Sequence, residues 1–248
     1  MTQEKSPIDL RGVKSSARVA VLASGGLDSA VLLALLARRA AGVEPLFVAG
    51  GHPWEVSELT ALKRFIKVLA DARIAAPVRL EFPVRATLNR YWGQAGYRPA
   101  FHQGYEANYI PGRNIALLSA VAIHCFTRGI DTVALGICKG NPYPDAQPAF
   151  LRAFEGMVRR GMGFKLRVLT PFIACEKEDL VMAALDLPLR ETLSCVNPKA
   201  GKHCGLDCNK CAERQKAFAL AGITDPTVYA KRPPRVDWAK HAWSAWTR

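Results

Sequence analysis

The protein has 248 residues, of which 50% are hydrophobic and 22% are charged, and this composition indicates a globular chain and excludes a disordered one. No apolar run reaches the ~20 residues that a membrane-spanning helix needs, and the N-terminal segment lacks the apolar stretch of a secretory signal. We therefore expect a cytoplasmic protein without a membrane partner. The 34 lysines and arginines exceed the 21 acidic residues, for a formal charge of +13. This excess favours anionic partners such as nucleotides or RNA, although a basic solvated surface explains it equally well.

The first third of the chain predicts strands that alternate with helices. Apolar runs predict strands over residues 18–23, 44–49 and 78–82. Apolar residues at helical spacing predict a helix that starts at Asp28 and ends before Gly42, and a second helix over 54–69. Because connections between parallel strands are right-handed, this order indicates an α/β fold with a parallel sheet flanked by helices.

The rest of the chain continues this pattern after an interruption. Residues 83–110 are rich in aromatics, glycine and proline, and we expect a long loop there. Asn114 is positioned to cap the helix that follows. The remaining expected elements are a strand over 131–137, a helix over 148–160, a strand over 165–170, a helix over 177–185 and a helix that ends at Phe218. The basic tail 230–248 contains three tryptophans and is read as a packing arm or a partner surface.

The segment between the first strand and the first helix predicts a phosphate-binding loop. It consists of Ser24, Gly25, Gly26, Leu27, Asp28 and Ser29. The glycines let the backbone approach a ligand, and the N–H groups and dipole of the helix N-terminus favour an anion. A carboxylate at Asp28 suits a phosphate that arrives with Mg²⁺. The alternative is an ordinary glycine-rich turn with Asp28 as a helix cap.

Four of the seven cysteines are clustered near the C-terminus and predict a metal site. They are Cys195, Cys204, Cys208 and Cys211. Four thiolates at this spacing can reach one tetrahedral Zn²⁺, and a site with all four positions filled is structural. A redox-active pair, free thiols and an iron–sulfur cluster are the alternatives, and His203 is a less suitable substitute ligand.

Together the glycine-rich loop and the cysteine cluster resemble the 7-cyano-7-deazaguanine synthase (QueC-type) family of the PP-loop ATP pyrophosphatases. Three further segments agree with that family, namely Ile110-Pro111-Gly112-Arg113-Asn114, Tyr143-Pro144-Asp145 and Glu191-Thr192-Leu193-Ser194-Cys195. The resemblance implies a Rossmann-like PP-loop domain over 18–190, a small zinc-binding subdomain over 191–229 and the tail 230–248. It also implies a homodimer.

The resemblance implies an ATP-dependent ligase. The carboxylate of 7-carboxy-7-deazaguanine would be adenylated and converted with ammonia to the nitrile, with release of AMP and pyrophosphate. By their match to the family, residues 24–29 would hold ATP with Mg²⁺, and Asp28 and Arg113 would act in catalysis. Tyr143 and Asp145 would line the substrate pocket, since a carboxylate suits the donor edge of a guanine-like ring. Arg113 as a surface ion-pair partner, and 143–145 as a simple turn, are the alternatives.

The chain departs from the family's pattern at Leu27, over 49–55 and over 139–146, and these positions surround the predicted substrate pocket. A paralogue that adenylates such a carboxylate for transfer to an amine of a protein or metabolite is therefore a second hypothesis. An RNA-acting PP-loop enzyme is a third, because basic surfaces with aromatic residues bind RNA. A non-enzymatic zinc protein would leave the loop unexplained.

Overall fold

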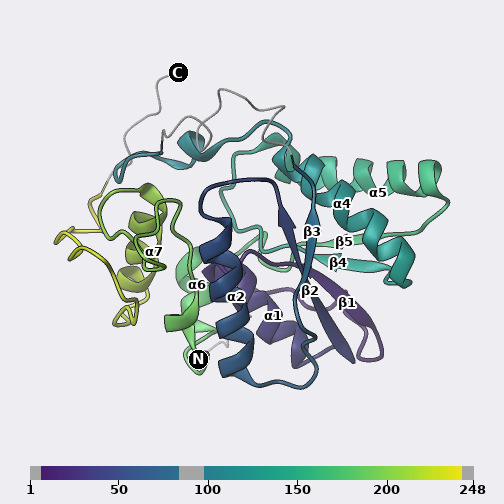
Figure 1. The fold of residues 1–248 in the computed structure, drawn as a ribbon, viewed down its shortest axis with the longest axis horizontal. Coiled ribbons are helices and arrows are strands. Elements are labelled where there is room, and N and C mark those ends of the chain that lie inside the picture. Colours follow the sequence, from purple (N-terminus) through teal and green to yellow (C-terminus); the bar gives the residue numbers. More distant parts are fainter. Residues whose placement is uncertain (1–6, 84–97, 242–248) are drawn as a thin grey trace.

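A five-stranded parallel sheet forms the centre of the protein (Figure 1). The computed structural model describes residues 7–83 and 98–241. The strands are β1 (Arg18–Leu22), β2 (Gly42–Ala49), β3 (Val78–Glu81), β4 (Thr132–Ala134) and β5 (Arg167–Leu169). All neighbours are parallel and the order is β3-β2-β1-β4-β5. The predicted fold class, a parallel sheet flanked by helices, is confirmed.

Helices cover both faces of this sheet, which is why its central strands are continuous apolar runs. The α-helices are α1 (Leu27–Ala37), α2 (Glu55–Leu69), α4 (Arg113–Arg128), α5 (Pro148–Met162), α6 (Lys177–Met182) and α7 (Asn209–Leu220). One core joins β1 to α1, α2, α6 and α7. A second core joins β1, β2 and β4 to α4 and α5, which lie together on the right of Figure 1.

The first helix, α1, ends before Gly42 as predicted, and Gly42 opens β2, where it pairs in register with Arg18. One local prediction, the cap of α4, is wrong. Asn114 does not cap its helix, because α4 begins at Arg113 and Gly112 is its N-cap. Gly112 has a φ of 66°, a left-handed conformation that glycine adopts without strain.

The segment between β3 and α4 was expected to be a long loop, and its residues 84–97 lie outside the described residues. The described part contains a short 3-10 helix, η1 (Tyr105–Asn108). Asn209 at the start of α7 holds this part, since its backbone N–H donates to the Pro99 carbonyl at 3.2 Å. Its Nδ2 donates to the carbonyls of Gln103 and Gly104.

The strand order reverses direction at β1, and this places a site between β1 and β4. In open parallel sheets, ligands bind beyond the carboxyl ends of the strands where the order reverses. The loop of residues 24–29 follows β1, and Gly136 follows β4. A Cβ added to Gly136 would lie 3.3 Å from the Cβ of Asp28, so glycine lets the segment after β4 approach the first turn of α1 closely.

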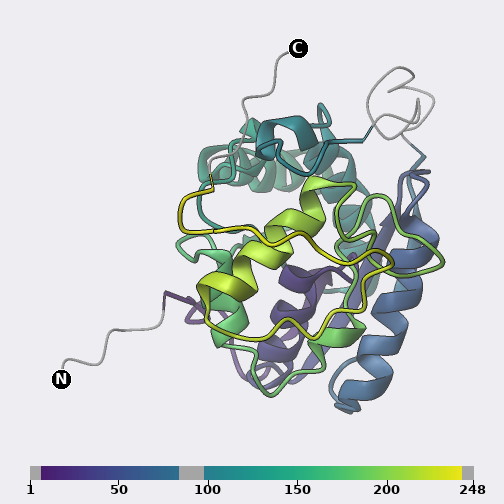
Figure 2. The same cartoon turned by 90° about the vertical axis from the view of Figure 1, so that its left-hand side faces the viewer.

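The segment after α7 returns across that helix, as the yellow trace in Figure 2 shows. The N–H groups of Ala230 and Lys231 donate to the carbonyls of His203 and Cys204. Trp238 packs against Phe101 at 6.0 Å between ring centroids. The described tail therefore packs on the protein. Within residues 7–83 and 98–241, no helix combines the length and apolar character that crossing a membrane requires.

Candidate active site

The loop of residues 24–29 is bent tightly against α2. Gly25 has a φ of 85°. A Cβ at Gly25 would lie 2.5 Å from the carbonyl oxygen of Glu58 and 2.9 Å from the backbone nitrogen of Leu62. Only glycine satisfies both the dihedral angle and the space, so the close approach of the loop to α2 explains this residue.

Replacing Gly25 with alanine is expected to lower the free energy of unfolding by about 2–4 kcal/mol, because a left-handed φ and a backbone clash both oppose a side chain. The distorted loop should also lose affinity for ATP. Thermal unfolding and calorimetric titration with ATP measure the two effects. Gly161→Ala is the matched control, since a Cβ at this position in α5 meets nothing within 4 Å. An alanine variant at Gly25 that unfolds and binds ATP like the control would contradict the prediction.

Side chains from distant segments shape the loop. Gly26 is the N-cap of α1 and makes no side-chain capping bond, so Asp28 lies in the first turn and is not the cap. The Leu27 N–H donates to the Ser194 hydroxyl at 3.3 Å, and the Leu193 N–H donates to the Gly25 carbonyl at 2.8 Å. The segment that leads into the cysteine cluster therefore holds the loop directly.

A chain of charges connects the loop to α7. Lys177 Nζ lies 3.2 Å from Asp28 Oδ2 and 3.1 Å from Glu213 Oε2. Lys210 Nζ lies 3.1 Å from the same Glu213 oxygen. Glu213 is buried, and the two lysines line the cavity beside the loop. One buried carboxylate thus positions two cations at this cavity.

The N-terminus of α4 forms another wall of the cavity. Asp145 accepts hydrogen bonds from the backbone N–H of Asn114 at 2.8 Å and from Asn114 Nδ2 at 3.3 Å. A carboxylate at a helix N-terminus is electrostatically favourable. Tyr143 stacks on Tyr109 with 5.6 Å between ring centroids. Burial raises the pKa of the Tyr143 hydroxyl well above its usual value, so this hydroxyl stays protonated.

The walls enclose a cavity of about 290 Å³. The structure brings most of the sequence-predicted site residues together around it: Ser24, Gly26, Leu27, Asp28, Ser29, Arg113, Tyr143 and Asp145. Gly25 turns toward α2 instead. Leu27, Trp54 and Asn141, which lie where the chain departs from the family's pattern, also line this cavity. His52 and Trp54 are stacked at 4.7 Å.

The sequence analysis does not identify four polar residues that line the cavity, namely Glu58, Asn108, Lys177 and Lys210. Burial raises the pKa of Glu58 to about 8, and Glu55 adds to this rise, while Arg113 and Lys210 oppose it. Glu58 is therefore largely a neutral acid near pH 7. No motif marks these residues, because each comes from a different element that only the tertiary fold brings to the cavity.

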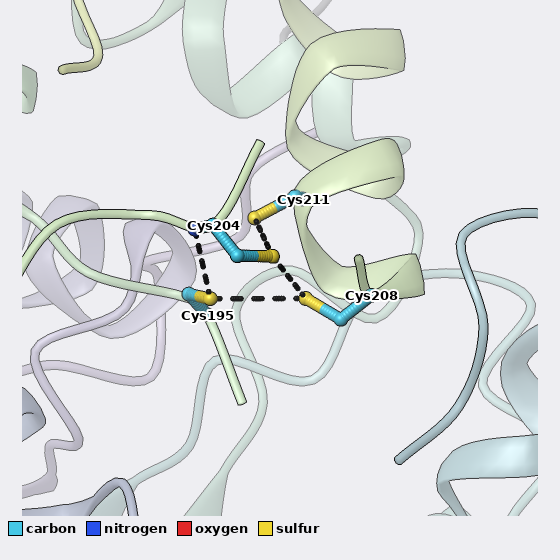
Figure 3. Close-up of side chains that lie close together, drawn as sticks. All are labelled: Cys195, Cys204, Cys208 and Cys211. Atoms are coloured by element: carbon cyan, nitrogen blue, oxygen red, sulfur yellow. Dashed lines mark hydrogen bonds between the residues drawn. The ribbon is translucent and has the colours of Figure 1, made fainter. Parts of the chain in front are cut away.

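The four clustered cysteines point toward one another in a separate, buried site (Figure 3). The sulfur of Cys204 lies 3.5 Å from those of Cys208 and Cys211, and Cys195 lies 3.8 Å from Cys208. All four sulfurs lie within 4.8 Å of one another. This arrangement is suited to a metal ion, as predicted.

Two polar residues close to the cysteine cluster, His203 and Arg214, make hydrogen bonds that hold the surrounding segments together. His203 is not a member of the cluster, because its Nε2 accepts a hydrogen bond from the Ser194 N–H at 3.1 Å. Burial lowers the pKa of His203 well below its usual value, in agreement with a neutral ring that accepts. Arg214, which follows the last cysteine of the cluster, is buried and donates to Thr192 Oγ1 and the Leu189 carbonyl. The cluster is therefore fastened to the loop segment through these bonds.

Comparison with known proteins agrees with the motifs. The family model described as queuosine biosynthesis protein QueC matches residues 18–222. The chain belongs to the QueC family. The 7-cyano-7-deazaguanine synthase of Anaeromyxobacter sp. (strain Fw109-5) is 36% identical over 230 residues, which cover 87% of this chain and 97% of the relative. That of Azoarcus sp. (strain BH72) is 32% identical over 234 residues, covering 87% and 98%. The predicted family membership is confirmed.

A solved structure is similar to this QueC-family chain in fold. The U34-tRNA thiolase NcsA from Methanococcus maripaludis with its [4Fe-4S] cluster superposes with a TM-score of 0.51 at 14% identity. The match covers 88% of this chain and 77% of that chain. At this identity the likeness concerns the fold alone, and it agrees with the predicted PP-loop architecture.

Proposed function

We propose that the protein is an ATP-dependent ligase that converts 7-carboxy-7-deazaguanine and ammonia to 7-cyano-7-deazaguanine, with release of AMP and pyrophosphate. The observation that carries the proposal is that one cavity is lined by the PP-loop and by Arg113 and Tyr143, two residues that match the family's motifs, in a QueC-family chain. The carboxylate oxygen attacks the α-phosphate of ATP, and ammonia then displaces AMP to give an amide. A second ATP activates the amide oxygen, and loss of AMP leaves the nitrile.

The residues of the cavity suit the charge that develops in such a reaction. Residues 24–29 offer backbone N–H groups at the N-terminus of α1 for the departing pyrophosphate. Lys177, Lys210 and Arg113 supply positive charge from two other walls of the cavity. Catalysis of phosphoryl and adenylyl transfer depends largely on positioning and on neutralising charge, and this cavity supplies both.

Asp28 fits the Mg²⁺ that accompanies ATP. Its Oδ2 is paired with Lys177, whereas its Oδ1 is buried and meets no hydrogen-bond partner in the described part of the chain. A buried carboxylate oxygen without a partner is costly unless a ligand satisfies it. Mg²⁺ takes carboxylate and phosphate oxygens and neutralises phosphate charge. We assign Asp28 Oδ1 as the protein ligand.

The geometry of the cysteine cluster favours Zn²⁺ among the possible metals. Zinc–sulfur bonds of 2.3 Å in a tetrahedron place neighbouring sulfurs about 3.8 Å apart. Three of the sulfur–sulfur distances are 3.5–3.8 Å, and all of them are within 4.8 Å. A cubane cluster with four irons holds its thiolates further apart, because the irons lie between them. Zn²⁺ with four thiolates would serve a structural role, since it leaves no open coordination position.

We also propose that the protein forms a homodimer through an apolar face of α4. Ile115, Ile123 and Phe126 are exposed and lie along one side of α4. Exposed apolar side chains that gather on one helix face mark interaction surfaces. A second copy of the chain is the occupant that the family resemblance implies, and sedimentation of the purified protein tests this assignment.

A second candidate function has its own support. Several positions at which the chain departs from its family line the substrate cavity, among them Leu27 and Trp54. A cavity wall of changed chemistry suits a changed nitrogen donor. The paralogue would keep adenylation and transfer the deazaguanine acyl group to an amine of a metabolite or protein.

One assay separates the two candidates. Purified protein is incubated with ATP, Mg²⁺, ammonium and 7-carboxy-7-deazaguanine, and mass spectrometry measures AMP and the nitrile. We expect both products. AMP without the nitrile supports the second candidate, and an amine that restores AMP-linked turnover identifies the donor. Adenylation itself releases pyrophosphate, so absence of both pyrophosphate and AMP with this carboxylate contradicts both candidates.

A further inference from the structure

Asn108 has a buried side-chain amide that makes no hydrogen bond within the described part of the protein. The residue ends η1 and is 5% exposed. Neither its Nδ2 nor its Oδ1 has a hydrogen-bond partner among residues 7–83 and 98–241. Its side chain lines the cavity of the PP-loop. Because most buried polar groups are paired, an amide with both ends unpaired requires an explanation, and a ligand in the cavity supplies one.

Asn108 lies on the side of the cavity that is formed by the start of α4 and the segment around Tyr143. The next residue, Tyr109, stacks on Tyr143, and the Ile110 carbonyl accepts a hydrogen bond from the Arg113 N–H at 3.2 Å. These contacts hold Asn108 on the wall formed by the start of α4 and the segment around Tyr143. The loop of residues 24–29 begins from β1 instead. Asn108 thus belongs to the wall that we assign to the carboxylate substrate, not to the wall assigned to the phosphates.

Two other polar side chains of this wall, Asp145 and Asn141, make hydrogen bonds within the protein. Both oxygens of Asp145 accept hydrogen bonds from Asn114. The Asn141 Oδ1 accepts a hydrogen bond from the Tyr143 N–H at 3.0 Å. An unpaired amide presents one acceptor oxygen beside two N–H donors. Its complement is a ring edge that carries an N–H donor next to a carbonyl acceptor.

We infer that Asn108 recognises the substrate by pairing with the lactam edge of the deazaguanine ring. The amide oxygen accepts from the ring N–H, and the amide nitrogen donates to the adjacent ring carbonyl. This inference rests on the proposed function and names the group that reads the heterocycle. The adenine of ATP also carries a hydrogen-bond donor next to an acceptor. The experiment below therefore measures the KM for ATP and the KM for 7-carboxy-7-deazaguanine separately.

The Asn108→Leu variant keeps the size of the side chain and removes both hydrogen bonds. We expect the KM for 7-carboxy-7-deazaguanine to rise about 10- to 100-fold, the usual effect of losing hydrogen bonds in a buried site. The KM for ATP should change by less than about threefold. The melting temperature of the unliganded variant should equal or exceed that of the wild type, because an unpaired buried amide has been removed.

Asn141→Leu is the control for stability, because this cavity asparagine uses its side chain within the protein. We expect its melting temperature to fall. A substrate analogue gives a second readout: methylation of the ring carbonyl oxygen removes the lactam N–H and the free carbonyl. The wild type should discriminate strongly between the substrate and this analogue, and Asn108→Leu should discriminate little.

Four results would overturn parts of this assignment. A rise of the KM for ATP alone would make Asn108 an adenine-binding residue. Unchanged KM values with a lower melting temperature would make it a structural residue. A variant that discriminates against the analogue as strongly as the wild type would place the lactam elsewhere. Each of these leaves the proposed function intact, whereas a wild-type protein that forms no AMP with this carboxylate contradicts the function and the inference together.

Discussion

Replacing Asp28 with asparagine is expected to lower the rate of AMP release by at least about 10²-fold while the protein stays folded. Asparagine has nearly the same shape but lacks the negative charge that binds Mg²⁺ and faces Lys177 at 3.2 Å. The variant weakens the contact with Lys177, but Lys177 keeps its ion pair with Glu213 at 3.1 Å, so the protein should stay folded. AMP release under saturating ATP measures the effect, and thermal unfolding verifies the fold.

The control for this variant is Asp186→Asn. Asp186 is an exposed carboxylate that pairs with Arg38 away from the cavity. Exposed ion pairs contribute about 0–1 kcal/mol, so this control should be as active as the wild type and almost as stable. Wild-type activity in the Asp28 variant would remove the residue from the proposed Mg²⁺ site. A Mg²⁺ titration adds a test, because the variant should require a higher concentration for the same rate.

The sequence predicted the scaffold of the site because the scaffold depends on local patterns. The apolar run before Ser24, the glycine pair and the helical spacing after Asp28 are adjacent in the chain, and the structure has β1, the loop and α1 at these places. The cysteine spacing likewise brought four sulfurs together. The cap at α4 was mispredicted because asparagine is a common N-cap, whereas here Gly112 precedes the helix and Asp145 satisfies its amides from another segment.

The rest of the site depends on contacts between distant segments. Glu213 positions Lys177 from 36 residues away, and nothing in either local sequence indicates that pair. Asn108 lies in a segment of low regularity, and its unpaired amide is visible only when its surroundings are known. Glu58 is on a helix surface that is buried because the PP-loop packs on it through Gly25. The sequence pattern alone would place residues such as Asn108 and Glu58 in a loop or on a helix and would not show that they line the cavity.

Loss of the metal that we propose for the cysteine cluster is expected to inactivate the enzyme as well as to destabilise it. The cysteine cluster lies outside the group of residues that line the cavity, but its leading segment holds the loop. Leu193 donates to the Gly25 carbonyl, Ser194 accepts from the Leu27 N–H, and the Ser194 N–H donates to His203 within the cluster region. A disordered cluster would therefore release the loop from one side.

Cys208→Ala tests this coupling. We expect the bound metal to be lost, the free energy of unfolding to fall by about 3 kcal/mol and the melting temperature to fall by roughly 10 °C. AMP release should fall by at least about tenfold, since the loop loses the bonds that shape it. Metal analysis, thermal unfolding and the AMP assay measure the three effects, and a chelator applied to the wild type should reproduce them.

The matched control is Cys125→Ala, the same substitution at a fully buried cysteine of α4 outside the cluster. This control should keep its metal and its activity, and lose only the stability that a small cavity costs. A Cys208 variant that loses its metal yet releases AMP at the wild-type rate would show that the bonds from Leu193 and Ser194 do not depend on the metal. The cluster would then stabilise α7 alone, and the PP-loop would keep its shape through its contact with α2.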